Sequence, residues 1–207
     1  MSTTFRVYPH ISEIPTFSQI IYLSNRRLHQ FLSLYGIDAR PRLNVVLRST
    51  KPDLEQPTSQ DLPARWRDDL YAWFYIPPAP GGTDAYFRKV DDQEKEIWLE
   101  EIETNKRVNQ RRDLILSRLE AGHFWYFRRS MGQPAIINLA YGLVAASVAE
   151  LTDGFIYSGD NAWDYERFPA IAAEFDEWYF RPEETKDTNF REWSERCIRA
   201  ISAELTT

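Results

Sequence analysis

The sequence predicts one layered domain of the α+β or mixed α/β class that spans residues 1–207. Strand-like runs alternate with helical patterns along the chain, which favours a sheet with helices packed around one core. The 207 residues contain no repeat, low-complexity stretch or obvious linker, and this length suits a single domain with a sizeable core. The patterns predict about five short strands and about six helices.

The first third of the chain is expected to contain two strands and two helices. Residues 5–8 and 42–49 are short apolar runs typical of strands, and the polar, proline-marked run that follows residue 49 is expected to be a loop. Residues 16–35 carry apolar side chains at every third or fourth position, and Gly36 ends this predicted helix. Residues 63–75 begin with a proline suited to a first helical turn, so a second helix is predicted there.

The middle of the chain is expected to hold the core of the domain. Residues 84–90 are predicted as a strand, and residues 91–121 lack Gly and Pro, which indicates one long helix or two consecutive helices ended by Gly122. The run HFWYFRR at 123–129 is rich in rings and is predicted as a strand. Residues 134–151 are apolar on nearly every face, so we expect a buried helix against the sheet.

The last third begins with a predicted strand at 155–158, and the run GDNAWDY after it is predicted as a loop or turn. Residues 167–180 and 188–204 have the spacing of amphipathic helices. The sequence does not indicate which strands are neighbours in the sheet.

Composition and charge limit the class of partner. The net charge of −6 argues against a nucleic-acid partner, because nonspecific binding of nucleic acid needs a basic surface. The N-terminus has no apolar signal segment, and the longest apolar run is short for a bilayer-spanning helix. With one cysteine, Cys197, no internal disulfide can form. These observations predict a cytoplasmic protein with no membrane partner.

Signatures of catalysis and of cofactor binding are absent from the sequence. The histidines His10, His29 and His123 are scattered, and neither they nor Cys197 have the spacing of a zinc site. No glycine-rich phosphate loop or nucleophile elbow occurs. We therefore expect a protein that is not an enzyme and that binds no metal or cofactor.

Three carboxylates keep an enzymatic alternative open. Asp153, Asp160 and Asp164 lie near a strand-to-helix corner, and a carboxylate-dependent hydrolase would use such acids, with or without a divalent metal. Helix capping and turn chemistry explain the same residues without catalysis. A pocket in which the three acids converge would favour the hydrolase.

The negative charge of the chain is concentrated between residues 150 and 187. Eleven acids and three bases give this region −8, whereas the whole chain carries −6, so the remainder is +2. An acidic surface with exposed rings suits capture of a basic protein, because charge guides the approach and aromatic side chains anchor the contact. The candidate partner-binding residues are Tyr157, Asp160, Asn161, Trp163, Asp164, Tyr165 and Glu166.

A family resemblance points in the same direction. The run HFWYFRR, with GQPAIINLAYGLVAASVAELTDGFIYSGDNAWDYERFPAIAAEFDEWYF shortly after it, resembles bacterial immunity proteins of polymorphic toxin systems. The run is most similar to the immunity protein 52 family, which is found beside restriction-endonuclease-like toxins of type VI secretion systems. The likeness lies in the order of an aromatic strand with paired arginines, a small-residue helix and TDGFIYSGDNAWDY, and it covers about residues 123–180.

This resemblance implies a cytoplasmic inhibitor that binds one cognate toxin, expected to be a nuclease, and blocks its active site or substrate path. A nuclease has a basic substrate surface, which an acidic aromatic region would fit. Two other hypotheses remain: the hydrolase, and single-stranded nucleic-acid binding through HFWYFRR and the arginines around it. The sequence also leaves open whether the free protein forms a homodimer.

Overall fold

The computed structural model describes residues 2–49, 55–56 and 59–206, so part of the loop expected after residue 49 lies outside these ranges. The chain folds as an α+β domain, as predicted, around one sheet with the strand order β3-β2-β4-β5-β6-β1-β7-β8, in which all paired strands are antiparallel. The strands are β1 (Thr3–Tyr8), β2 (Asn44–Ser49), β3 (Glu55–Gln56), β4 (Leu70–Tyr75), β5 (Thr83–Lys89), β6 (His123–Arg129), β7 (Phe155–Tyr157) and β8 (Ala170–Ile171).

Within the described residues the chain forms seven α-helices and two short 3-10 helices. The α-helices are α1 (Phe17–Leu34), α2 (Asp92–Thr104), α3 (Lys106–Gln110), α4 (Arg112–Leu119), α5 (Ala135–Leu151), α6 (Ala172–Trp178) and α7 (Thr188–Thr206). The 3-10 helices are η1 (Tyr165–Arg167) and η2 (Pro182–Glu184). None of the described helices is both long enough and apolar enough to cross a membrane.

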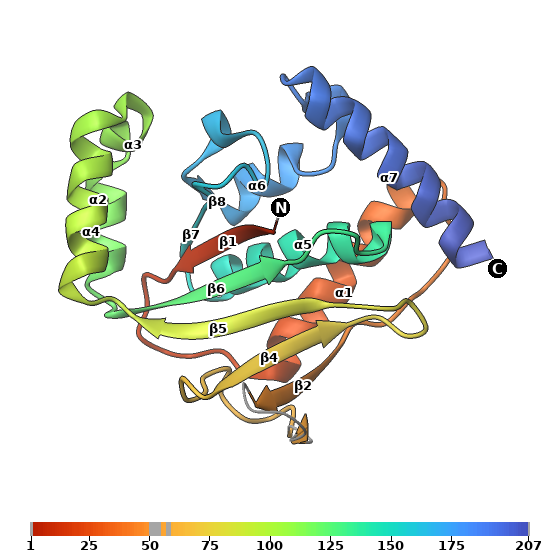
Figure 1. Ribbon diagram of the computed structural model, residues 1–207, viewed down its shortest axis with the longest axis horizontal. Coiled ribbons are helices and arrows are strands. Elements are labelled where there is room, and N and C mark those ends of the chain that lie inside the picture. Colours follow the sequence, from red (N-terminus) through yellow and green to blue (C-terminus); the bar gives the residue numbers. More distant parts are fainter. Residues whose placement is uncertain (1, 50–54, 57–58, 207) are drawn as a thin grey trace.

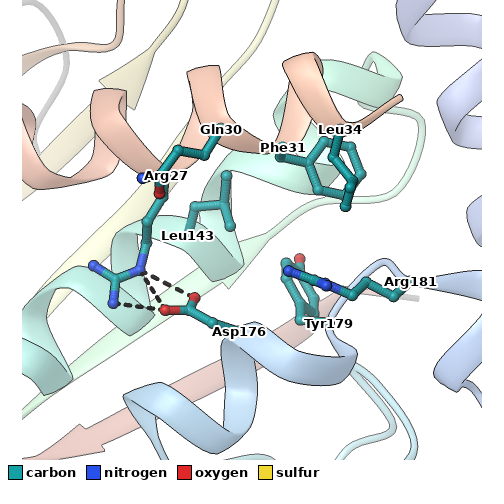
Figure 2. Close-up of a pocket in the computed structure, with 8 residues that line it drawn as sticks. All are labelled: Arg27, Gln30, Phe31, Leu34, Leu143, Asp176, Tyr179 and Arg181. Carbon is teal, nitrogen blue, oxygen red and sulfur yellow. Dashed lines mark hydrogen bonds and ion pairs between the residues drawn. The ribbon is translucent and has the colours of Figure 1, made fainter. Parts of the chain in front are cut away.

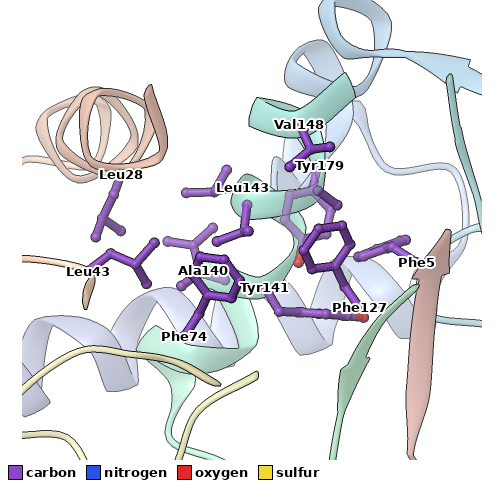
Figure 3. Close-up of a cluster of buried hydrophobic side chains, with 14 of the residues drawn as sticks. Phe5, Leu28, Leu43, Phe74, Phe127, Ala140, Tyr141, Leu143, Val148 and Tyr179 are labelled. Carbon is purple, nitrogen blue, oxygen red and sulfur yellow. The ribbon is translucent and has the colours of Figure 1, made fainter. Parts of the chain in front are cut away.

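The main core lies between one face of the sheet and the helices α1 and α5 (Figure 1). Alternate strand residues such as Phe5, Phe74 and Phe127 point to this face, which is the period of two that a half-buried strand requires. Figure 3 shows these rings packed beside Tyr141 of α5, with Leu28 of α1 on the far side of the cluster.

Helix α5 is the centre of this core. Every residue from 135 to 149 is buried, which confirms the expectation that a helix apolar on nearly all faces packs in the interior. Gly142 lets another ring approach closely, because a Cβ at that position would lie 2.2 Å from Tyr179 Cζ. The hydroxyl of Tyr179 donates a hydrogen bond to the Asn138 carbonyl oxygen over 2.9 Å.

A second, smaller core covers one end of the opposite face. Helices α2, α3 and α4 form an arm at the left of Figure 1 and pack on Tyr8, Phe124 and Phe155. The segment 91–121 is therefore three helices, whereas one or two were predicted. Asn105 caps α3 through Arg107 N and Val108 N, which breaks the run. The rest of this face, on β2, β4, β5 and β6, carries partly exposed side chains.

The prediction of a helix at 63–75 is wrong, because residues 70–75 form the strand β4. In a helix, Trp66, Leu70, Trp73 and Phe74 would share one face. In the structure, Ala72 and Phe74 are buried while Trp73 is only partly buried, and this alternation is that of a strand. Trp66 precedes the strand and stacks on Phe17, with ring centroids 5.7 Å apart.

The predicted number of strands was also too low, and one helix is shorter than expected. The strands β3, β4 and β8 were not predicted, and β3 and β8 have two residues each, which is too short for a periodic pattern. The segment 167–180, predicted as one helix, holds the end of η1, then β8, then α6 of seven residues. The aromatic rings of this segment are buried, but several of them are attached to backbone that is not helical.

Candidate functional site

The loop after β7 is fastened to the start of β1. Asp160 accepts hydrogen bonds from Thr4 N at 3.0 Å and from Thr4 Oγ1 at 2.7 Å. Ser158 Oγ donates to Asp160 Oδ1 and accepts from Ala162 N, both at 3.1 Å. Asn161 adopts a left-handed backbone with a φ of 58°, a conformation that asparagine tolerates better than most residues. Asp160 therefore fixes the loop, and its carboxylate is engaged within the chain.

Trp163 belongs to the core. Its side chain is 1% exposed, so the expectation that it lies on the partner-binding surface is wrong. The ring contacts Phe180, with centroids 5.2 Å apart, and also Phe190 and Trp193 of α7 at 5.3 and 5.9 Å. It joins the loop to the C-terminal helix, and burial of so large a ring outweighs the polar character of its neighbours in the sequence.

Asp164 is also buried, with 6% of the residue exposed, which corrects the expectation of an exposed acid. Its Oδ1 accepts from Glu166 N at 3.3 Å and so caps η1. Its Oδ2 has no hydrogen-bond partner in the described chain, and Arg167 Nε lies 3.8 Å away. Arg167 is itself held, because its guanidinium donates to the carbonyl oxygen of Glu184.

A groove of about 560 Å³ lies beside this loop, where η1 faces the start of α7. Its lining residues are Asn161, Asp164, Tyr165, Glu166, Lys186, Asp187, Asn189 and Phe190. Three acids and one lysine make the lining negative. Tyr165 is 59% exposed at the groove, and Glu166 is exposed beside it. We call the groove that these eight residues line the acidic groove.

The acidic groove gathers four of the seven residues expected to bind a partner, namely Asn161, Asp164, Tyr165 and Glu166. Asp160 and Trp163 are used inside the chain, as described above. Tyr157 turns toward the helical arm, where its ring centroid lies 4.7 Å from that of Trp98. Burial and the nearby Glu101 carboxylate raise the pKa of Tyr157. These three residues do not line the groove.

The other half of the groove comes from residues 186–190, where the sequence predicts the end of a connection and the start of the helix at 188. Asp187 caps α7, because its Oδ1 accepts from Asn189 N at 2.7 Å and from Phe190 N at 3.3 Å. An aspartate just before the helix predicted at 188 indicates a helix cap. The sequence does not predict that Asp187 lies close to the loop, because this proximity depends on the long-range packing of Trp163 on α7.

Much of the negative charge between 150 and 187 lies outside the groove and is paired with arginines from earlier elements. These ion pairs are Arg27 with Asp176 at 2.8 Å and with Glu150 at 2.5 Å, Arg111 with Glu174 at 2.5 Å, and Arg118 with Asp153 at 3.2 Å. The region of charge −8 is therefore partly neutralised in the folded chain, and the acidic groove is a smaller surface than the sequence count suggested.

A second hollow, of about 270 Å³, lies between α1, α5 and α6. Figure 2 shows Arg27 in its wall, turned toward Asp176, with Tyr179 and Arg181 nearby. Arg27 is buried, and its Nε and Nη2 donate to the two Asp176 oxygens. This arginine already binds a carboxylate of its own chain, so we assign the hollow a structural role.

The contacts of the three acids do not support the hydrolase alternative. Asp153 pairs with Arg118 on α4, Asp160 is bound to Thr4 on β1, and Asp164 faces Arg167. In the part of the chain that the structure describes, no cluster of three or more His, Cys, Asp or Glu side chains could hold a metal ion.

Comparison of the chain with protein-family models, with curated proteins and with solved structures finds no match. The exposed acids Glu166 and Asp187, beside the exposed Tyr165, form a surface that can accept a basic side chain of another protein.

Proposed function

We propose that this chain is a cytoplasmic immunity protein that binds a cognate toxin, expected to be a nuclease, and neutralises it by covering the active site or the substrate path. The observation that carries the proposal is the acidic groove, because Asp164, Glu166 and Asp187 line it together with the exposed Tyr165. The resemblance of residues 123–180 to immunity proteins of polymorphic toxin systems supports the same assignment.

The groove would act on the toxin by charge and by shape. A nuclease carries basic side chains where the phosphates of its substrate bind, and an acidic surface speeds encounter with such a site. Tyr165 would then anchor the contact, because exposed tyrosines at the centre of an interface often dominate its binding energy. Glu166 and Asp187, whose side chains are exposed, would pair with a lysine or arginine of the toxin that enters the groove.

A growth assay tests this proposal. The toxin encoded by the gene next to that of this protein is expressed in bacteria with and without this protein, and colony counts are compared. We expect the toxin alone to lower the count by several orders of magnitude and co-expression to restore it. Equal killing in both cultures, with this protein present in the soluble fraction, would show that the proposal is wrong. An unrelated acidic protein at the same expression level serves as the control.

A further inference from the structure

Three tyrosines form a row across the partly exposed part of the sheet. Tyr71 of β4, Tyr86 of β5 and Tyr126 of β6 lie side by side, with ring centroids 5.8 Å apart for the first pair and 5.9 Å for the second. Tyr86 and Tyr126 face each other in the strand register. None of the three is fully buried. We call this row the tyrosine ladder.

Arginines extend the ladder at both ends. In the strand register Arg48 of β2 is the partner of Tyr71, and Arg6 of β1 is the partner of Tyr126. The Arg6 guanidinium carbon lies 6.0 Å from the Tyr126 ring centroid, within the range of a cation–π contact. Two residues further along β5, the guanidinium carbon of Arg88 lies 5.4 Å from the ring centroid of Tyr86.

Of three ion pairs on this face, two leave the arginine more exposed than its acid, whereas Arg88, 41% exposed, pairs at 2.8 Å with Asp68, which is 85% exposed. Arg128 is 41% exposed and its partner Asp84, at 3.5 Å, is 15% exposed. Arg6 is 33% exposed and its partner Glu94, at 3.0 Å, is 12% exposed. Burial raises the pKa of Asp84, which is consistent with a carboxylate that lies under the guanidinium groups. At Arg6 and Arg128 an approaching molecule therefore meets the guanidinium group before the acid that pairs with it.

A hollow of about 340 Å³ opens beside the ladder, where the sheet meets the start of α2. Tyr86, Tyr126 and Phe124 supply its aromatic lining, and Arg6, Arg88 and Lys89 supply its positive charge. Asp91 and Glu94 also line it. One end of the ladder thus offers aromatic surface beside three cations and two acids.

We propose that the tyrosine ladder binds single-stranded nucleic acid, with bases stacked on the rings and phosphates on the flanking arginines and Lys89. A single strand is an extended polyanion whose bases can be splayed onto a row of aromatic side chains on a sheet. An acidic protein segment would match the arginines but would leave the row of rings unused. The strands β4, β5 and β6 that carry the three tyrosines lie outside the segment 150–187, which holds the negative excess of the chain. The inference is independent of the toxin proposal.

Fluorescence anisotropy with labelled 12-nucleotide oligouridine and oligothymidine tests the inference. We expect the full chain to bind at 50 mM salt. Affinity should fall on the order of tenfold at 200 mM, as neutralisation of about three phosphates implies. Tyr86→Leu should weaken binding about tenfold, because it removes one stacking platform. Tyr22→Leu removes a tyrosine that is exposed on α1 and should leave binding unchanged.

Arg88→Gln gives a second variant at the edge of the ladder, where loss of folding is not expected, and it should lower both the affinity and its salt dependence. Absence of binding by the wild-type chain at 50 mM salt would overturn the inference. Equal binding by the wild type, Tyr86→Leu and Arg88→Gln would overturn it as well. Tighter binding of a labelled 12-residue polyglutamate peptide than of either oligonucleotide would replace it with a protein partner.

Discussion

Trp163→Ala is expected to lower the free energy of unfolding by about 3–5 kcal/mol, the loss typical of a buried tryptophan replaced by alanine. The ring is buried between the loop and α7 and contacts Phe180, Phe190 and Trp193. Its removal leaves a cavity where these rings meet. Urea denaturation followed by circular dichroism measures the loss as a shift of the midpoint at constant slope.

The neighbouring Tyr165→Ala is the matched control, because Tyr165 is two residues away and mostly exposed. It should change the free energy of unfolding by no more than about 0.5 kcal/mol. If the two variants unfold at the same urea concentration, the assignment of Trp163 to the core is wrong.

Arg27→Met is expected to cost about 3 kcal/mol, the lower end for breaking a buried ion pair. Arg27 is buried, whereas its partners Asp176 and Glu150 keep some contact with solvent, which limits the cost of leaving them unpaired. The loss should persist at 1 M salt, because a buried pair is screened little. Thermal and urea unfolding at low and high salt measure the loss of stability and its dependence on salt.

Arg196→Met supplies the comparison for Arg27→Met. Arg196 pairs with Glu192 at 3.8 Å on the exposed side of α7, and such surface pairs contribute at most about 1 kcal/mol. A loss for Arg27→Met no larger than that for Arg196→Met would contradict the structural role given to the buried ion pair.

Elements with a strong local pattern could be predicted from the sequence. The strand at 123–129 and the helix at 134–151 agree with β6 and α5 to within a residue, because ring content and all-round apolar character are local properties. The strand β4 was missed because Trp66 and Leu70, outside or at the edge of the strand, imitate a helical face when read together with Trp73 and Phe74.

The candidate site could be predicted only in part, because its geometry depends on distant residues. The sequence placed Tyr165 and Glu166 in an exposed turn, and both are exposed. The burial of Trp163 depends on Phe190 and Trp193 in a helix more than twenty residues later. The neutralisation of Asp176 depends on Arg27, which is 149 positions earlier. No sequence pattern within residues 150–187 predicts these contacts of Trp163 and Asp176 with distant residues.

Calorimetric titration of the purified toxin into this protein tests the central claim, which is that the acidic groove binds the toxin. We expect Tyr165→Ala to weaken the affinity about tenfold or more. Glu166→Lys should also weaken the affinity, and the loss should be larger at low salt than at high salt. The matched variants Tyr22→Ala and Glu100→Lys, at exposed positions on α1 and α2, should bind like the wild type. Unchanged affinity for both groove variants would contradict the claim.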